Sequence, residues 1–160
     1  MDIQRLSEKY SVRRLDEKDV GAIYALCREN RLFYQYHPPL VTVEGVLEDM
    51  QALPPRTPRE SKFYLGFWDK GTLVAILDLI LDYPAEKTAF IGLFMMHAAY
   101  QNRGIGSAIL RDILLYLQSL EYKEVRLGVD KGNPQSYAFW VKNGFVTTGE
   151  EQYLLMSRKL

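Results

Sequence analysis

Seven short segments of the chain have the hydrophobic pattern of β-strands. Apolar and polar residues alternate in Phe63–Trp68, whereas Leu73–Leu81 is almost continuously apolar, as in a central strand buried on both faces. Asp69, Lys70 and Gly71 lie between these two segments and are typical of a hairpin turn. The predicted strands are Tyr10–Leu15, Phe63–Trp68, Leu73–Leu81, Ala89–Met96, Glu124–Val129, Phe145–Thr148 and Gln152–Ser157.

Four other segments repeat apolar residues at the spacing of an amphipathic helix. The longest, Gly104–Ser119, carries a continuous apolar stripe. Asp16 and Thr42 are suitable N-caps for two helices in the first third of the chain. Asn133, followed by a proline at the first helical position, predicts a short fourth helix that ends at Gly144.

The remaining segments predict loops and complete the order of elements. Leu32–Pro39 is aromatic and stopped by proline, and Leu53–Ser61 contains three further prolines, so both are predicted to be loops. The order is therefore βααβββαβαββ. Meandering strands followed by helical crossovers imply an α/β protein with a mixed sheet and helices on both faces. A length of 160 residues fits one domain with its own core.

Composition narrows the class of protein. Twenty basic and twenty acidic side chains cancel, whereas a nucleic-acid-binding domain usually has a basic excess. Cys27 is the only cysteine, which permits no internal disulfide and favours a reducing cytoplasm. The first residues lack the apolar core of a signal peptide, and no apolar run approaches the ~20 residues that span a bilayer. We therefore expect a cytoplasmic protein that binds neither nucleic acid nor membrane.

The turn Gln101–Gly106 is the most informative stretch. It lies between a predicted strand and a predicted helix, and it contains two glycines. The first amides of a helix have no intrahelical acceptor, and the helix dipole places partial positive charge there. Glycine lets a ligand approach the backbone closely. The turn therefore predicts a site for a phosphate-bearing ligand.

Two common glycine-rich motifs do not fit this turn. A Walker loop requires G-x-x-x-x-G-K-[ST], which is absent. A dinucleotide fingerprint requires a third glycine three residues after Gly106, where Ile109 stands. The remaining pattern, Q-x-R-G-x-G between a strand and a helix, resembles the acyl-CoA-binding motif of the GNAT superfamily of N-acetyltransferases.

A second motif supports the resemblance. Residues Asn133–Phe145 are similar to the GNAT segment N-x-x-[AS]-x-x-[FL]-[YW]-x-K-x-G-[FY]. The two motifs occur in the family's order with one strand between them. The resemblance implies a single N-acetyltransferase domain over residues 1–160, with the GNAT fold. That fold is one mixed, mostly antiparallel central sheet of about seven strands with helices on both faces.

The resemblance also assigns the cofactor, acetyl-CoA. In the family the strand before the turn parts from its neighbour and pairs its free backbone with the pantetheine arm. The turn and helix start hold the pyrophosphate through backbone amides. Arg103 either adds charge to the phosphates or is a solvated turn residue, and Asn133 contacts the pantetheine while it caps its helix. The implied cofactor-binding residues are Phe94, Met95, Met96, Gln101, Asn102, Arg103, Gly104, Ile105, Gly106, Ser107, Asn133 and Trp140.

The proton-transfer residues depart from the family pattern. Members often carry a tyrosine beside the sulfur as general acid, but Trp140 stands there, and an indole N–H is no acid. Helical spacing puts Tyr137 on the same predicted face as Asn133, Ser136 and Trp140, so Tyr137 is the candidate acid. Trp140 taken alone is better explained as a core aromatic than as a residue that lines a ligand site.

The sequence does not identify the general base either. Glutamates found in some members fall here on Gly128 and Phe90. Asp78 interrupts an apolar strand, which predicts either a perturbed pKa suited to catalysis or a carboxylate satisfied by partners in the fold. The other candidate proton acceptors are Asp82, Glu44, His37 and water.

We therefore predict an N-acetyltransferase that moves an acetyl group from acetyl-CoA directly to a primary amine. The acceptor, a small molecule or a peptide, is expected beside Phe33–His37, and the protein is expected to be a monomer or homodimer. One alternative is an acyl-CoA-binding regulatory module without turnover, since the usual catalytic groups are missing. The other alternative is the transfer of a longer acyl group.

Overall fold

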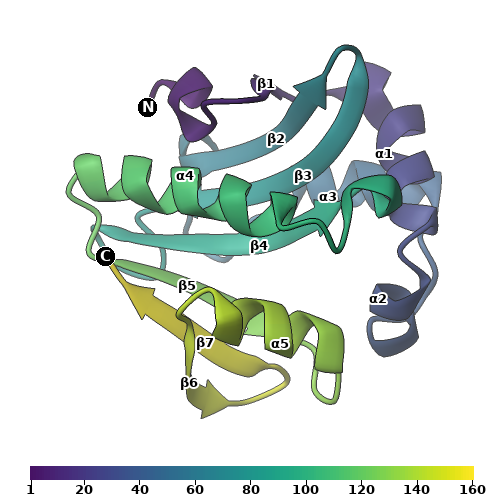
Figure 1. Ribbon diagram of the computed structural model, residues 1–160. Coiled ribbons are helices and arrows are strands. Elements are labelled where there is room, and N and C mark those ends of the chain that lie inside the picture. Colours follow the sequence, from purple (N-terminus) through teal and green to yellow (C-terminus); the bar gives the residue numbers. More distant parts are fainter.

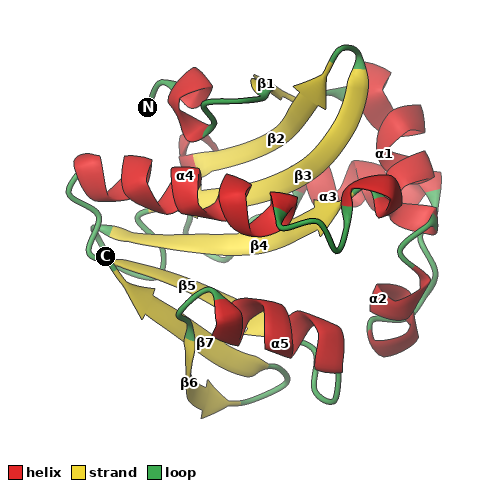
Figure 2. Cartoon of the chain, in the orientation of Figure 1, coloured by secondary structure: helices red, strands yellow, loops and turns green.

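The computed structural model, which describes all residues from Met1 to Leu160, contains one seven-stranded sheet (Figures 1 and 2). Its spatial order is β1-β2-β3-β4-β5-β7-β6, and every neighbouring pair is antiparallel except β4 and β5. This is the mixed, mostly antiparallel sheet that the sequence predicts. The strands are β1 Ser11–Arg14, β2 Lys62–Asp69, β3 Thr72–Leu81, β4 Thr88–Met96, β5 Glu124–Val129, β6 Val146–Glu150 and β7 Leu154–Lys159.

Helices cover both faces of the sheet. In Figure 1, α4 crosses β2 to β4 and α5 crosses β5 and β7 on the near face, while α1 and α3 lie behind. Each face has its own core: a cluster of 26 buried residues includes the apolar side of α4, and a cluster of 10 includes that of α1 and α3. The helices are α1 Val20–Arg28, α2 Arg31–Tyr36, α3 Val43–Gln51, α4 Ile105–Ser119 and α5 Pro134–Lys142, with short 3-10 turns at Ile3–Leu6, Glu17–Asp19, Arg59–Ser61 and Ala98–Tyr100.

One predicted loop is wrong. Residues 32–39 are not a continuous loop, because Arg31–Tyr36 form the helix α2. Aromatic side chains have modest helix propensity, so the sequence pattern alone favours a loop. Phe33 and Tyr34 nevertheless pack against the cluster beneath α1 and α3, and this tertiary contact outweighs the weak propensity. The prediction was right about the stop, since α2 ends before Pro38.

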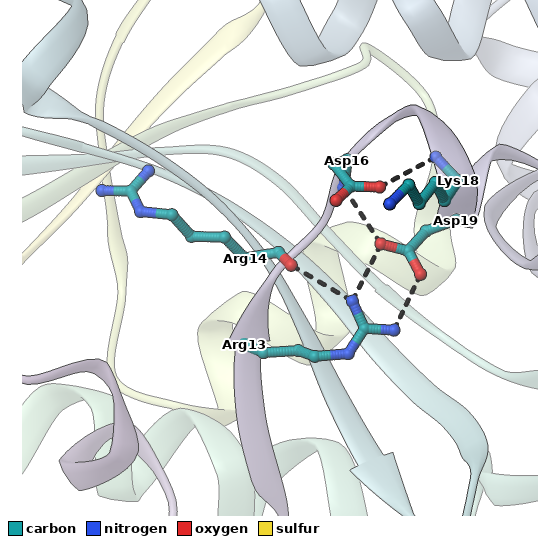
Figure 3. A network of polar contacts seen from close by, with 5 residues as sticks. All are labelled: Arg13, Arg14, Asp16, Lys18 and Asp19. Atoms are coloured by element: carbon teal, nitrogen blue, oxygen red, sulfur yellow. Dashed lines mark hydrogen bonds and ion pairs between the residues drawn. The ribbon is translucent and has the colours of Figure 1, made fainter.

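The connection from β1 to α1 is fixed by a polar network (Figure 3). The Arg13 guanidinium donates to both carboxylate oxygens of Asp19, at 2.9 and 2.7 Å, and holds the pKa of Asp19 below its ordinary value. Asp16 and Asp19 form a reciprocal capping box at the start of the turn that leads into α1. The predicted cap at Asp16 is confirmed, and α1 therefore leaves the sheet at a fixed point.

β4 and β5 separate midway along their length. Their parallel pairing covers only Thr88–Ile91 opposite Glu124–Leu127. Beyond Ile91, β4 continues beside β3 alone, after a bulge opposite Asp78 and Leu79. The second half of β4 therefore has one edge without a strand partner, in the interior of the sheet.

No helix of the structure is both long enough and apolar enough to traverse a lipid bilayer.

Candidate functional site

A cavity of about 380 Å³ lies where β4 leaves β5, between the last residues of β4, the start of α4 and the side of α5. It brings together residues that are far apart in the sequence. Among the predicted cofactor residues, those that line the cavity are Phe94, Met95, Met96, Gln101, Asn102, Gly104, Gly106, Ser107 and Trp140. Asn30 and Phe33 from the first third of the chain also line it.

The end of β4 offers a free backbone amide to this cavity. The His97 N–H donates to the Val74 carbonyl across β3 at 2.8 Å. Because successive residues of a strand point their backbone groups to opposite sides, the N–H and C=O of Met96 face the gap left by β5. The Met96 carbonyl is already satisfied there by the side-chain amides of Asn30 and Gln101, each at 3.0 Å. The Met96 N–H remains available.

Asn30 is a functional-site residue that sequence reasoning missed. Its Nδ2 donates to the Leu26 and Met96 carbonyls, and its Oδ1 accepts from Gln101 at 2.7 Å. It lies 66 residues from Met96 in sequence. A polar residue at the end of a helix is ordinarily a cap, so nothing in the local pattern indicated a contact to β4.

The turn before α4 matches the predicted anion site in its backbone. Asn102 and Gly104 have left-handed φ values of 58° and 74°, and the first α-helical bond is the Ala108 N–H to the Gly104 carbonyl at 3.1 Å. The N–H groups of residues 105–107 therefore have no helical acceptor. A Cβ on Gly106 would lie 3.3 Å from Phe139 and 3.5 Å from Met96, so a glycine here lets α4 approach both α5 and β4.

The ligand-facing side of α5 differs from the predicted one. Ser136 and Trp140 line the cavity as expected, but Tyr137 does not, and its side chain is 43% exposed on another side of the helix. The cavity side is shared instead with Phe139, which stacks on Phe94 at a centroid distance of 5.9 Å. Trp140 packs against Phe94, Phe139 and Phe145, so it is a core residue that also borders the site. The face that carries Asn133 and Tyr137 is therefore not the one that lines the cavity, because the aromatic contacts of residues 139 and 140 fix the rotation of α5.

Asn133 and Arg103 lie beside the cavity but do not line it. The Asn133 Oδ1 accepts the Ser136 N–H at 3.2 Å, which confirms the predicted N-cap, and its Nδ2 is buried without a partner. Arg103 is exposed, its guanidinium lies over the Tyr100 ring, and it donates to the Ala99 carbonyl. Ile105, the remaining predicted residue, packs against the main core.

Asp78 has a partner in the fold. Its carboxylate lies 2.8 Å from the Lys62 ammonium on the neighbouring strand; the Lys62 side chain is buried and that of Asp78 is mostly buried. Burial raises the pKa of Asp78, and Lys62 opposes that shift. Gly92 in the bulge leaves room for the carboxylate, since a Cβ there would lie 2.7 Å from it. Asp78 is not among the residues that line the cavity.

The other candidate proton acceptors are scattered. Asp82, in the β3–β4 turn, accepts hydrogen bonds from the Lys87 backbone N–H and from the Tyr122 hydroxyl. Glu44 is exposed in the first turn of α3. Burial raises the pKa of Cys27 to about 11, as expected of a core thiol. His37, by contrast, follows α2 and contacts Asp130 just after β5.

A second groove of about 1170 Å³ continues from the cavity over the sheet, between α4, the end of α5 and the last two strands. It shares Gly104, Ser107 and Lys142 with the cavity. Its lining contains four cationic side chains against one carboxylate, that of Glu124. The cations are Arg111, Lys142, Arg158 and Lys159.

Parted parallel strands, a free strand amide and an open helix N-terminus together define an acyl-CoA-dependent transferase fold. The chain belongs to the acetyltransferase (GNAT) family, whose model matches residues 19–145. Acetyl-CoA, the acetyl donor of this family, is its cofactor.

Solved structures agree with this family in fold. An acetyltransferase from Thermus thermophilus superposes with a TM-score of 0.77 at 22% identity, over 95% of this chain and 97% of that one. A PaiA N-acetyltransferase from Thermoplasma acidophilum, in complex with coenzyme A, superposes with a TM-score of 0.71 at 19% identity, over 94% of this chain and 98% of that one. A chimeric spermidine N-acetyltransferase from Vibrio cholerae and hSSAT gives a TM-score of 0.71 at 17% identity, over 95% of this chain and 96% of that one. A comparison with curated proteins finds no match at the sequence level.

Proposed function

We propose that this acetyltransferase moves an acetyl group from acetyl-CoA to the nitrogen of a primary amine by direct transfer. The observation that carries the proposal is the free Met96 N–H, which faces the same cavity as the open amides of α4. Two sets of fixed donors that face one cavity fit a ligand that carries both a carbonyl and a pyrophosphate.

The residues present fit the cofactor. The amides of residues 105–107 and the Lys142 ammonium supply positive charge for phosphate oxygens. The basic groove beyond Lys142 continues that positive lining, which suits the phosphorylated nucleotide portion of coenzyme A. Aromatic faces of Phe94 and Phe139 offer an apolar wall for an extended aliphatic arm.

Acetyl-CoA supplies a thioester whose carbonyl is open to attack by a neutral amine. The Met96 N–H is held by the sheet and donates toward the cavity without having to reorganise, which is the requirement for stabilising developing negative charge. Asn30 and Gln101 bind the Met96 carbonyl, so that the same peptide unit is fixed at both ends. Trp140 supplies no acidic proton.

The relatives in fold support an amine acceptor. The PaiA protein and the spermidine enzyme are both N-acetyltransferases by name. Phe33 from α2 lines the cavity opposite α4, so the first two helices border the place where an acceptor would meet the thioester. The acceptor is therefore proposed to enter from the side of α2.

The first test is binding. At a coenzyme A concentration of about 100 times Kd, the free energy of unfolding should rise by about 2.7 kcal/mol. For a chain of this size that is about 5–11 °C in melting temperature. Gly104→Glu places an anionic side chain beside the phosphate site and should remove the shift, whereas Glu121→Gln, in the turn that follows the far end of α4, is the matched control. A wild-type protein that coenzyme A does not stabilise would overturn the proposal.

The second test is turnover. Acetyl-CoA is incubated with single amines, among them spermidine, an aminoglycoside and a peptide with a free N-terminus, and thiol release is followed. Acceptor-dependent release supports the transferase. Binding without release favours the alternative function, a regulatory acyl-CoA-binding module, which is consistent with Trp140 and the outward position of Tyr137.

A further inference from the structure

His37 and Asp130 form an imidazole–carboxylate pair that joins the end of α2 to the end of β5. The His37 Nδ1 lies 3.0 and 3.1 Å from the two carboxylate oxygens of Asp130. His37 follows α2, and Asp130 follows β5, 93 residues later. Asp130 is mostly buried, with 13% of its side chain exposed, whereas that of His37 is 44% exposed.

This contact fixes which ring nitrogen can accept a proton. An ionised carboxylate only accepts hydrogen bonds, so the Nδ1 must carry the hydrogen and donate it to Asp130. In the neutral ring the Nε2 then has the free lone pair. The structure gives the Nε2 no hydrogen-bonding partner in the protein. The ring is therefore set up as a base whose accepting atom is open.

Aromatic side chains hold the imidazole in place. The ring lies 5.2 Å from Phe33 at an interplanar angle of 30°, and 6.4 Å from Tyr153 at 23°. Phe33 also lines the cofactor cavity, so the Phe33 ring lies between that cavity and the His37 imidazole. Tyr153 lies against Gly128, where a Cβ would approach it to 3.2 Å.

The charged and titratable groups around His37 come from four elements. Asp130 contacts it from the end of β5, and Asp49 of α3 interacts with it electrostatically. Tyr153 faces it from the β6–β7 turn, and Tyr36 precedes it on α2. Beside Asp130, Lys131 is neutralised by Glu150 at 3.0 Å. The surroundings are therefore acidic, which favours a cationic ammonium as the approaching group.

We propose that His37 is the proton acceptor for the amine substrate and that Asp130 is its positioning residue. This assignment rests on the proposed N-acetyltransferase function. The Nε2 takes one proton from the substrate ammonium, and the resulting imidazolium is stabilised by the Asp130 carboxylate. The amine lone pair then forms the amide C–N bond as the thioester C–S bond breaks. The sulfur keeps the electrons of that bond and takes up the second amine proton to become the free thiol, and the His37 imidazolium returns its proton to the solvent.

The first experiment needs no turnover. The protein has two histidines, so ¹⁵N labelling of the imidazoles gives two ring spectra, and a His97→Asn variant assigns them. At about pH 9, where an imidazole is uncharged, His37 should carry its hydrogen on Nδ1. In Asp130→Ala this tautomer preference should be lost. A wild-type His37 with its hydrogen on Nε2 would overturn the proposal.

The second experiment measures the pH dependence of kcat/KM with the best amine of the panel. His37→Gln should lower kcat/KM at neutral pH by about 10²-fold, in line with a general base. The deficit should shrink toward about pH 10, where a primary amine loses its proton unaided. Asp130→Asn should lower kcat more than it changes KM, and Asp130→Glu should recover part of the loss. His97→Asn, which keeps a cap for its 3-10 turn, is the matched control.

The outcomes separate the two claims. If wild-type protein releases thiol and His37→Gln has the same rate and pH profile, the assignment of His37 is wrong and the transferase function stands. If wild-type protein releases no thiol with any amine, both the transferase function and the role of His37 as proton acceptor are wrong. Coenzyme A should raise the melting temperature of His37→Gln as much as that of wild type. A variant that loses this shift would show that His37 supports the fold of the cofactor site and would overturn its role as base.

Discussion

Replacing Lys62 with methionine should expose how the buried pair with Asp78 contributes to stability. The Lys62 ammonium and the Asp78 carboxylate are 2.8 Å apart, and their side chains are only 4% and 13% exposed. The other Asp78 oxygen, Oδ1, is buried without a partner. Lys62→Met keeps the length of the side chain and leaves that carboxylate with no counter-ion.

The expected loss follows from this burial. Removing one member of a buried ion pair costs about 3–5 kcal/mol, because the remaining charge keeps its desolvation penalty. At about 2–4 °C per kcal/mol for a chain of this size, the melting temperature should fall by about 6–20 °C. The double variant Lys62→Met/Asp78→Leu carries no buried charge, and it should be far closer to wild type than the single variant is.

The loss should depend on pH with a definite sign. Burial raises the pKa of Asp78 and Lys62 lowers it, so the folded-state pKa rises further when Lys62 is removed. A carboxyl whose folded pKa exceeds its unfolded value, about 3.9, binds its proton more tightly in the folded state. Lys62→Met should therefore be closest to wild type at acidic pH and lose stability as the pH rises through the folded pKa of Asp78. Lys62→Met/Asp78→Asn, which has no titrating group there, should lack this dependence.

Urea unfolding followed by circular dichroism at several pH values measures these differences. The reasoning would be refuted by a Lys62→Met variant that is destabilised by less than about 1 kcal/mol. It would also be refuted if the free energies lost by Lys62→Met and by Asp78→Leu simply added in the double variant. The same variants test the predicted catalytic role of Asp78. A folded Lys62→Met/Asp78→Leu protein that keeps its transferase rate assigns Asp78 to the structure alone, and one that has lost it assigns Asp78 to the reaction.

Three further changes have definite expectations. Gly104→Ala meets no atom within 4 Å but must hold an alanine at φ 74°, so it should cost about 1–2 kcal/mol, measurable as a fall in melting temperature of about 2–8 °C. Asn30→Ala removes one of the two amides that hold the Met96 carbonyl; we expect a higher KM for acetyl-CoA with little change in the secondary structure, and an unchanged KM would contradict the role given to Asn30. Because burial raises the pKa of Cys27 to about 11, this thiol should react with Ellman's reagent at about pH 8 only after denaturation, and prompt reaction of the native protein would show the helix to be open.

The elements of the sheet could be predicted because their signals are local. Leu73–Leu81 is apolar except for Asp78 and became the buried β3, and the caps at Asp16, Thr42 and Asn133 were correctly placed. The turn before α4 was predictable as well, since a free helix N-terminus and a left-handed glycine act over a few residues. The helix α2 was not, because its stability comes from contacts of Phe33 and Tyr34 with another part of the chain.

By itself, the sequence determined the order of the elements, the family motifs and the backbone of the anion site. Each of these depends on neighbours within a few positions along the chain. Tertiary structure alone decided the partners of Asp78, the rotation of α5 that turns Tyr137 outward, and the contacts of Asn30 with Met96 and of His37 with Asp130. Those partners lie between 16 and 93 positions apart, and only the closing of the sheet and the packing of α2 against the end of β5 bring them within hydrogen-bond distance.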